Sequence, residues 1–243
     1  ASGLSGKGRM AEPADIVAFV EDLLSEKKMS LRGKRLIVTA GATIEAIDPV
    51  RFISNHSTGK MGYAIAEALA RRGAEVVLIS GRTSLPTPTG VRRIDVLSAQ
   101  EMYEASVREF ATADGAVMCA AVADYTPARG APATKLKKGD GELTIRLKRT
   151  HDIAAELGAH KAGRILVGFA LETDHEEANA EGKLQRKNFD FIVLNSLRDA
   201  GAGFGVDTNK VTLIDRAGRE ELPLLSKAET AEKIADKIES ILK

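Results

Sequence analysis

Cysteine and the large aromatic residues are scarce in this chain of 243 residues. Cys119 is the only cysteine, Trp is absent, and aromatic residues make up 4% of the sequence. A single cysteine excludes an internal disulfide, and the low aromatic content disfavours a protein that stacks nucleic-acid bases. The formal net charge of +1 also gives no strongly basic surface for a DNA or RNA duplex. We therefore expect no nucleic-acid partner.

Long apolar runs are absent as well. The sequence contains no stretch of about 18 uninterrupted apolar residues and no signal-peptide core, which predicts a cytoplasmic protein without a membrane partner. Apolar residues nevertheless form 44% of the chain, enough to bury the core of one large α/β domain or two small ones. The four histidines show neither HExxH nor Cys/His spacing, so no histidine-built metal site is expected.

The first 33 residues differ in composition from the rest. Residues 1–13 are rich in Gly and Ser, and residues 14–28 carry apolar side chains at helical spacing. We expect residues 1–33 to be a linker and an N-terminal helix left from a larger chain, although processing would produce the same N-terminus. Residues 34–243 are expected to form the functional domain.

From residue 35 onward, short apolar runs alternate with helical periods, which is typical of stacked βαβ units and a mostly parallel sheet. Residues 210–226 instead alternate about a Gly-containing turn and predict an antiparallel hairpin, followed by a closing helix over 227–243. The predicted fold is a Rossmann-like three-layer α/β fold. The expected strands are 35–41, 75–80, 92–97, 115–123, 164–171 and 190–195, and the expected helices lie near 60–72, 99–111, 152–160 and 174–187.

The loop after the first expected strand is unusually long. Roughly 18 residues separate this strand from the helix that begins near residue 60, whereas a βα connection usually takes about 2 to 6. In such sheets ligands gather where strands end and helices begin. Ser57, Thr58 and Gly59 stand at the first helical turn, where free N–H groups favour a phosphate or carboxylate. An ordinary N-cap by Ser57 or Thr58 explains these residues equally well, and the spacing fits neither the P-loop nor GxGxxG.

Two charged features follow the strand expected at 115–123. Asp124 stands at its C-terminal tip, where a carboxylate can accept ribose hydroxyls or hold a hydrated Mg²⁺, or can simply face solvent in a turn. Lys135, Lys137 and Lys138 then fall within "TKLKKGDGE", residues 134–142, which we term the flap. A cationic flap suits a polyphosphate, although a lysine run of this length is more often a solvated surface.

Two features of the C-terminal half also suit an anion. Thr150 and Asp152 stand at the start of a predicted helix, either as an anion or ribose site or as an ordinary helix cap. Lys183 and Lys187 lie four residues apart and therefore share one helix face. Their like charges repel unless an anion lies between them, while a solvated helix C-terminus is the simpler interpretation.

Six segments of the chain agree in order and spacing with one family. They are "GATIEAIDPVRFISNHSTGKMG" (41–62), "AAVADY" (120–125), "KLKK" (135–138), "HDIA" (151–154), "GFALET" (168–173) and "KLQRKNFDFIVLN" (183–195). Together they resemble the phosphopantothenate–cysteine ligase (phosphopantothenoylcysteine synthetase) family of coenzyme A biosynthesis, from about residue 34 to the C-terminus. Residues 8–13, "GRMAEP", also resemble the junction that follows a flavin-dependent decarboxylase domain in bacterial bifunctional proteins.

The resemblance implies an enzyme that joins the carboxylate of 4′-phosphopantothenate to the amine of cysteine. Bacterial members use CTP with Mg²⁺: an acyl-cytidylate and pyrophosphate form first, and cysteine then displaces CMP. The resemblance also implies a homodimer, an upstream decarboxylase domain fused to this chain, and no FMN in the chain itself. The alternatives are an ATP-using ligase of the same family, a non-catalytic nucleotide-binding module, and an NAD(P) oxidoreductase, the last without its GxGxxG fingerprint.

The site residues implied by the resemblance follow its motifs. Asn55 would hold the pantothenate part and the acyl-cytidylate, and Lys135 would stabilise charge on the triphosphate or intermediate, which makes these two the expected catalytic residues. Asp124 is the expected Mg²⁺ ligand. Since this chemistry needs no protein nucleophile, Cys119 is expected to be a small core residue. The implied nucleotide-binding residues are Met118, Cys119, Ala120, Asp124, Lys135, His151, Asp152, Ile153, Ala154, Phe169, Lys183 and Lys187, and the implied substrate-binding residues are Gly41, Thr43, Asn55, Ser57, Thr58, Gly59, Ala120 and Ala121.

Overall fold

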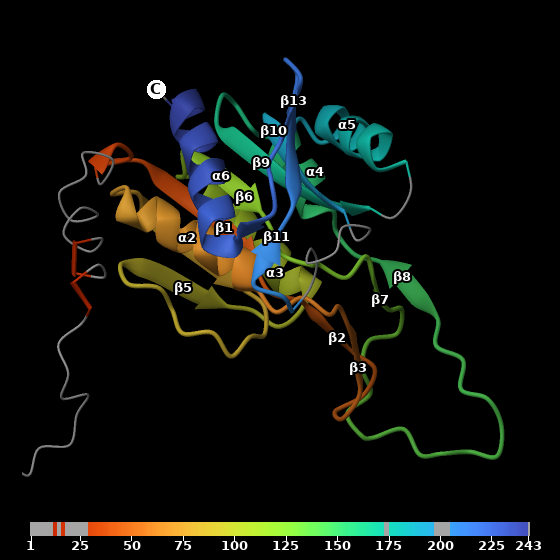
Figure 1. The fold of residues 1–243 in the computed structure, drawn as a ribbon. Coiled ribbons are helices and arrows are strands. Elements are labelled where there is room, and N and C mark those ends of the chain that lie inside the picture. The colour runs from red at the N-terminus through yellow and green to blue at the C-terminus, as the bar shows by residue number, and fades with distance from the viewer. Residues whose placement is uncertain (1–11, 14–15, 18–28, 173–174, 197–204, 243) are drawn as a thin grey trace, which may run out of the picture.

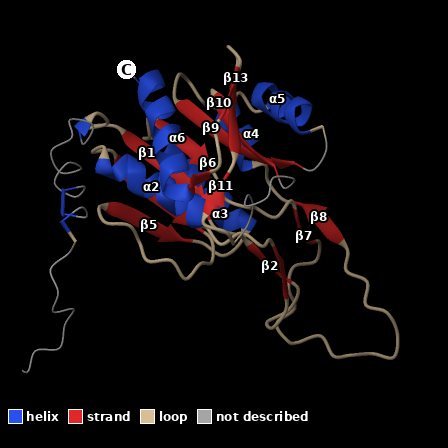
Figure 2. Ribbon diagram, in the orientation of Figure 1, coloured by secondary structure: helices blue, strands red, loops and turns tan. Residues whose placement is uncertain are grey.

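The computed structural model describes residues 12–13, 16–17, 29–172, 175–196 and 205–242 (Figure 1). The helix expected at 14–28 therefore lies almost wholly outside the described residues. The described chain is a mixed α/β structure of three layers, with helices on both faces of a central sheet (Figure 2). Within this part of the chain, no helix is long and apolar enough to cross a membrane.

Eight strands form the central sheet. They are β1 (Arg35–Ala40), β4 (Glu75–Ser80), β5 (Val91–Asp95), β6 (Gly115–Met118), β9 (Ile165–Glu172), β10 (Phe191–Ser196), β12 (Val211–Asp215) and β13 (Arg219–Glu221). Their order is β13-β12-β10-β9-β6-β1-β4-β5. The six strands from β10 to β5 pair in parallel, and β12 and β13 extend the sheet as an antiparallel hairpin. The predicted mostly parallel sheet with a C-terminal hairpin is confirmed.

Different helices cover the two faces of the sheet. In β1, Leu36 and Val38 pack in the cluster that includes α2 (Lys60–Arg71) and α6 (Lys227–Leu242). Ile37 points to the opposite cluster, which includes residues of α3 (Ala99–Phe110), α4 (Ile153–Ala159) and α5 (Glu176–Arg186). Because parallel strands are buried on both faces, they appear in the sequence as the continuous apolar runs from which they were predicted.

Among the described residues, three two-stranded ribbons lie outside the central sheet. They pair β2 (Ile44–Ala46) with β3 (Phe52–Ser54), β7 (Tyr125–Pro127) with β8 (Leu147–Arg149), and β11 (Thr208–Asn209) with β14 (Leu225–Ser226). The first ribbon occupies the segment that the sequence analysis treated as one long loop. Strands of two or three residues carry too few alternations to be predicted from a period of two.

The strand predicted over 115–123 is shorter than expected. β6 ends at Met118, and Ala121 leaves the sheet to form an isolated bridge with Ala42 in the loop after β1. The N–H of Ala121 also donates to the carbonyl of Gly41 at 2.8 Å. The small residues after Met118 therefore serve a contact between two loops and do not continue the strand.

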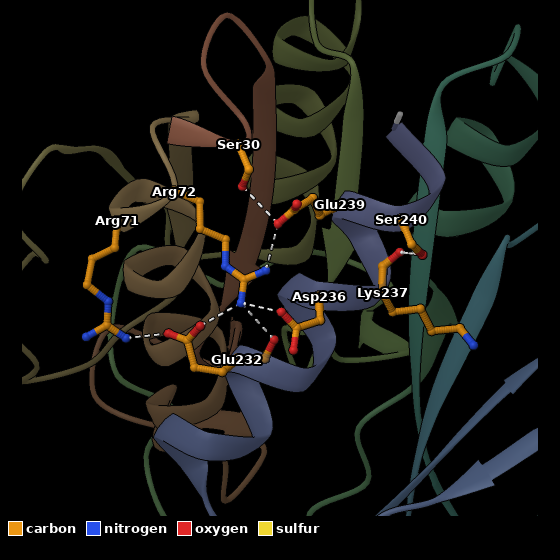
Figure 3. A network of polar contacts seen from close by, with 8 residues as sticks. All are labelled: Ser30, Arg71, Arg72, Glu232, Asp236, Lys237, Glu239 and Ser240. Carbon is orange, nitrogen blue, oxygen red and sulfur yellow. Dashed lines mark hydrogen bonds and ion pairs between the residues drawn. The ribbon is translucent and has the colours of Figure 1, made fainter. Parts of the chain in front are cut away.

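An ion network joins α2 to α6, which lie side by side on one face of the sheet (Figure 3). The side chain of Arg72 is only 3% exposed; its Nη2 lies 2.6 Å from Glu232 and 2.9 Å from Asp236, and its Nη1 lies 3.2 Å from Glu239. Nη2 also donates to the Glu232 carbonyl at 3.1 Å. The network fixes the two helices against each other, and the first residue of each helix lines the cavity described next.

Candidate active site

A cavity of about 740 Å³ opens at the carboxyl ends of the parallel strands. It lies where β1 and β6 adjoin, and the chain leaves these strands toward opposite faces, through α2 after β1 and α4 after β6. Open α/β sheets bind ligands at this kind of switch point. Thr39 of β1, Met118 of β6, Leu171 of β9 and Asn195 of β10 contribute to the lining.

Most of the predicted site residues line this one cavity. They come from the loop after β3, the end of β6 with the loop that follows, the start of α4, the middle of β9, and the last turn of α5 with its C-cap. They are Asn55, Ser57, Thr58, Gly59, Met118, Cys119, Ala120, Ala121, Asp124, His151, Asp152, Ile153, Ala154, Phe169, Lys183 and Lys187.

The N-terminus of α2 opens into the cavity without a capping side chain. Its N-cap is Gly59, which has a left-handed conformation with φ of 84°. The interpretation of Ser57 or Thr58 as the N-cap is therefore wrong; the Oγ of Ser57 instead accepts from the N–H of Gly59 at 3.4 Å. The uncapped N–H groups and the positive end of the helix dipole form a place for a phosphate or carboxylate.

Asn55 lies at the cavity wall, where its Nδ2 donates to the carbonyl of Ala121 at 3.2 Å. Gly41 and Thr43, which were expected to bind substrate, are not among the lining residues. Thr43 is fully buried, and its Oγ1 accepts from the N–H of Ala123 at 2.9 Å. Gly41 and Thr43 thus hold the loop after β1 against the loop after β6, and they shape the wall from behind.

Lys135 also lies outside the cavity lining. The flap belongs to the long loop between β7 and β8, which extends away from the sheet beside the β2–β3 ribbon (Figure 1). Lys135 is exposed, and the next residue, Leu136, is hydrogen-bonded to the turn between β2 and β3. For Lys135 to contact a ligand in this cavity, the flap must therefore move, or Lys135 must come from the flap of a second copy of the chain.

Cations outnumber carboxylates around the cavity. Among the described lining residues the cations are Lys60, Arg149, Lys183, Lys187 and Lys227, and the carboxylates are Asp124 and Asp152. A cleft lined mainly by one sign of charge concentrates ligands of the opposite sign. The lining therefore favours an anionic ligand, with positive charge at both the α2 side and the α5 side.

Asp152 joins the start of α4 to the end of α5. Its carboxylate accepts from a backbone N–H in the first turn of α4 at 3.0 Å and pairs with Lys187 at 3.0 Å. The interpretation of Asp152 as a helix cap is thus confirmed. The pairing also offsets the expected repulsion between Lys183 and Lys187, so these lysines do not need a bound anion to coexist. His151 stacks on Tyr103, with ring centroids 4.7 Å apart, which fixes its ring at the cavity edge.

Two lysines of the lining were not expected from the sequence. Lys60 pairs with Asp207 at 2.6 Å, and the ammonium of Lys227, a residue only 9% exposed, donates to the carbonyl of Thr208 at 3.2 Å. Burial and the nearby charge of Lys60 lower the pKa of Lys227. The β11–β14 ribbon brings these groups together from distant parts of the chain, and no local pattern in the sequence reports that contact.

Asn195, at the end of β10, is a third residue that the sequence analysis missed. Its Oδ1 is buried and has no hydrogen-bond partner among the described residues. Leaving a buried acceptor unpaired costs about 1–3 kcal/mol. A ligand that donates an N–H or O–H here removes that cost. The available signal was the position of Asn195 at the carboxyl end of a predicted parallel strand.

Cys119 lines the cavity as a neutral thiol. Burial raises the pKa of this thiol to about 12, so the thiolate that acts as a nucleophile is scarce at neutral pH. The side chain packs against the hydrophobic cluster beneath α2 and α6. This environment agrees with a small core residue and disfavours a catalytic one.

Asp124 lies at the exposed edge of the cavity. In the part of the chain that the structure describes, no group of three or more His, Cys, Asp and Glu side chains is placed to hold a metal ion. A lone carboxylate still suits Mg²⁺, which keeps several waters and commonly binds through one or two carboxylates together with substrate phosphates. Asp124 fits that limited role and does not fit a cage built from protein ligands alone.

Comparison with known proteins decides the family. The family model described as the DNA/pantothenate metabolism flavoprotein C-terminal domain matches residues 31–242. The chain belongs to this family. A crystal structure of the C-terminal domain of the coenzyme A biosynthesis bifunctional protein CoaBC has a TM-score of 0.74 and 44% identity, and the match covers 88% of this chain and 97% of that chain. The flavoprotein C-terminal domain fold is therefore shared along nearly the whole solved domain.

Two relatives of this flavoprotein C-terminal domain carry different names. The coenzyme A biosynthesis bifunctional protein CoaBC of Bacillus subtilis (strain 168) is 48% identical over 246 residues, which cover 100% of this chain and 60% of the relative. A protein of an unknown prokaryotic organism, named cysteine/cysteine sulfinic acid decarboxylase, is 53% identical over 244 residues, which cover 98% of this chain and 68% of the relative. The chain thus spans about three fifths to two thirds of these relatives.

Proposed function

We propose that this chain joins 4′-phosphopantothenate to L-cysteine in coenzyme A biosynthesis, using CTP. The observation that carries the proposal is the cationic cavity at the switch point of the sheet, where the uncapped end of α2 stands beside Asn55. A carboxylate oxygen of the substrate attacks the α-phosphorus of CTP, and pyrophosphate leaves. The cysteine amine then attacks the acyl carbon of the acyl-cytidylate, loses a proton, and displaces CMP as the amide forms.

Each side of the cavity has a separate task in this proposal. The α2 end, with Ser57, Thr58 and Asn55, holds the phosphorylated substrate and the acyl-cytidylate. The α4–α5 side, with Asp152 and Lys187, holds the nucleotide. Asp124 would hold Mg²⁺, which would supply positive charge against the triphosphate. Phosphoryl-type transfer asks the protein mainly for positioning and charge stabilisation, which is why no protein nucleophile is required.

We further propose that residues 34–243 are the ligase domain of a longer polypeptide with a flavin-dependent decarboxylase domain upstream, and that residues 1–33 connect the two. The bifunctional name of the relative that this chain spans to 60% of its length supports this arrangement. FMN would then belong to the upstream domain, and no residue of the cavity described above is assigned to it.

We also propose a homodimer that forms through two ribbons that project from the sheet, β2–β3 and β7–β8. Apolar side chains are exposed there, with Phe52 48%, Tyr125 46% and Leu147 44% exposed. One edge strand of the central sheet, β13, carries only exposed charged residues, which oppose strand pairing between copies. Sedimentation equilibrium is expected to give twice the 25.9 kDa chain mass; a monomer at micromolar concentration would exclude this dimer.

Pyrophosphate release by the purified chain tests the proposed function directly. The assay compares CTP with ATP, each with 4′-phosphopantothenate and Mg²⁺, in the presence and absence of cysteine. Release that needs phosphopantothenate and prefers CTP supports the proposal, and a preference for ATP would correct the nucleotide. Release of CO₂ from cysteine without nucleotide would instead support the decarboxylase activity named in the other relative. No reaction under any condition would favour a binding module.

Asn55→Asp is expected to reduce turnover by about tenfold or more, because it places a negative charge beside an anionic substrate and loses the Nδ2 donor to Ala121. The release of pyrophosphate and the formation of the amide are measured separately. Since the proposal assigns Asn55 to the substrate and the acyl-cytidylate, nucleotide affinity is expected to remain near the wild-type value. Unchanged rates for both half-reactions would remove Asn55 from the site.

A further inference from the structure

The segment "IDPVR", residues 47–51, forms the turn of the β2–β3 ribbon and is not part of the cavity lining. Asp48 is the centre of this turn. Its Oδ1 accepts from the N–H of Val50 and the N–H of Arg51, both at 2.8 Å, and its Oδ2 accepts from the Nε of Arg51 at 3.0 Å. The side chain of Asp48 is fully buried, whereas that of Arg51 is 43% exposed.

The same carboxylate reaches the flap. Oδ2 of Asp48 accepts from the N–H of Leu136 at 3.2 Å, and Nη2 of Arg51 donates to the carbonyl of Leu136 at 2.9 Å. Both backbone polar groups of Leu136 are therefore held by one ion pair that lies far away in the sequence. Leu136 directly follows Lys135, whose side chain is exposed.

Charge makes this attachment stronger than an ordinary loop contact. The hydrogen bond from Arg51 holds the pKa of Asp48 well below its usual range, although burial works in the opposite direction. Asp48 is accordingly a carboxylate throughout the neutral range, and hydrogen bonds to an ionised group are roughly twice as strong as neutral ones. Within the flap, the chain is thus fixed at Leu136, directly after Lys135.

We propose that Asp48 and Arg51 form a clasp on Leu136 that ties the flap to the β2–β3 ribbon, so that flap and ribbon move together when Lys135 approaches a ligand and Lys135 is positioned for the chemical step. The clasp sets where the base of the flap stands relative to the β2–β3 ribbon, and β3 leads directly into Asn55. Asp48 does not line the cavity and acts through Leu136, so it is a positioning residue. The catalytic part of this inference rests on the proposed function, whereas the attachment of the flap does not.

The variant Asp48→Asn is designed to break the clasp on Leu136 while leaving the β2–β3 turn intact. Asn retains an oxygen for the N–H groups of Val50 and Arg51, but its amide nitrogen cannot accept from Arg51 or Leu136. Asp215→Asn is the matched control, because Asp215 accepts from the N–H groups of Ala217 and Gly218 and pairs with Lys237 in the turn of another hairpin. Both variants lose one carboxylate charge in an otherwise similar turn.

Limited trypsin digestion measures how firmly the clasp holds the flap, independently of enzyme activity. Cleavage between Lys135 and Leu136 requires the clasp to open, while cleavage after Arg129 in the same long loop provides an internal reference. Asp48→Asn is expected to raise the ratio of the two cleavage rates about tenfold, because proteolysis follows the population of the open form. Asp215→Asn is expected to leave the ratio unchanged. An unchanged ratio in Asp48→Asn overturns the clasp.

Kinetics test the positioning of Lys135. Asp48→Asn is expected to lower kcat about tenfold with little change in nucleotide KM, and to have no further effect in a Lys135→Gln background, since the two residues then act as one unit. Additive losses overturn the positioning role. Leu136→Pro, which removes the N–H donor from the flap side and leaves the ribbon turn intact, is expected to reproduce the loss. If Lys135→Gln keeps full activity, the catalytic lysine and its positioning fail together, and the trypsin ratio still decides the clasp.

Discussion

Lys135→Gln is expected to reduce turnover by about 10²- to 10³-fold, the usual loss when one preorganised donor to developing charge is removed from an active site. Gln retains the length and polarity of the side chain but not the charge, so the change tests charge stabilisation directly. Because Lys135 is exposed and outside both hydrophobic clusters, the midpoint of thermal unfolding is expected to stay within about 1 °C of the wild type. Pyrophosphate release and thermal unfolding are measured on the same preparation.

Lys137→Gln is the matched control for this loss. Lys137 is another exposed flap lysine, two positions further on, and its substitution changes the net charge by the same amount. A general electrostatic attraction of the triphosphate to the flap predicts similar losses for both variants, which decrease as salt is added. A specific contact predicts a large loss only for Lys135→Gln. Equal losses, or wild-type turnover in Lys135→Gln, would contradict the proposed role.

The central sheet was predictable because burial on both faces leaves a strong trace in the sequence. The runs that form β1 and β4 are continuous and apolar, and their residues alternate between the two hydrophobic clusters as a sheet between two helical layers requires. The ends of the helices α2, α3, α4 and α5 were predicted to within about two residues, which is the usual uncertainty of helix ends. These signals are local, so a single sequence is sufficient to read them.

The cavity was predictable mainly where its residues follow a strand, apart from Lys183 and Lys187, which share one face at the end of α5. Asp124 and the residues near Met118 come after β6, and Asn55 comes after β3 in the loop that joins β1 to α2. Lys227 instead reaches the cavity through the β11–β14 ribbon, and Asp48 of the β2–β3 turn contacts Leu136 of the flap. Contacts of this kind depend on tertiary structure. No period or spacing in a single chain encodes them, and the uncapped end of α2 likewise became visible only in three dimensions.

Arg72→Met is expected to lower the free energy of unfolding by about 3 kcal/mol, because it removes a buried guanidinium that pairs with three carboxylates, of which Glu239 is the least exposed. Burial works to lower the pKa of Arg72, but the carboxylates of Glu232 and Asp236 outweigh this effect and raise it, so the guanidinium is charged in the folded protein. Met fills similar space without charge. When the Arg72 guanidinium is lost, Glu239, whose side chain is only 13% exposed, keeps the hydroxyl of Ser30 as a hydrogen-bond donor (Figure 3).

Arg71→Met is the control that distinguishes the effect of a buried arginine from that of an exposed arginine in the same ion network. Arg71 precedes Arg72, and its side chain is 43% exposed while it pairs with Glu232 at 2.6 Å. An exposed ion pair contributes about 0–1 kcal/mol, so this variant is expected to unfold within about 4 °C of the wild type, whereas Arg72→Met is expected to unfold about 6–12 °C lower. Similar shifts in the two variants would show that the buried guanidinium does not hold α2 to α6. A large shift for Arg72→Met alone ties the stability of the fold to the two helices whose first residues line the cavity.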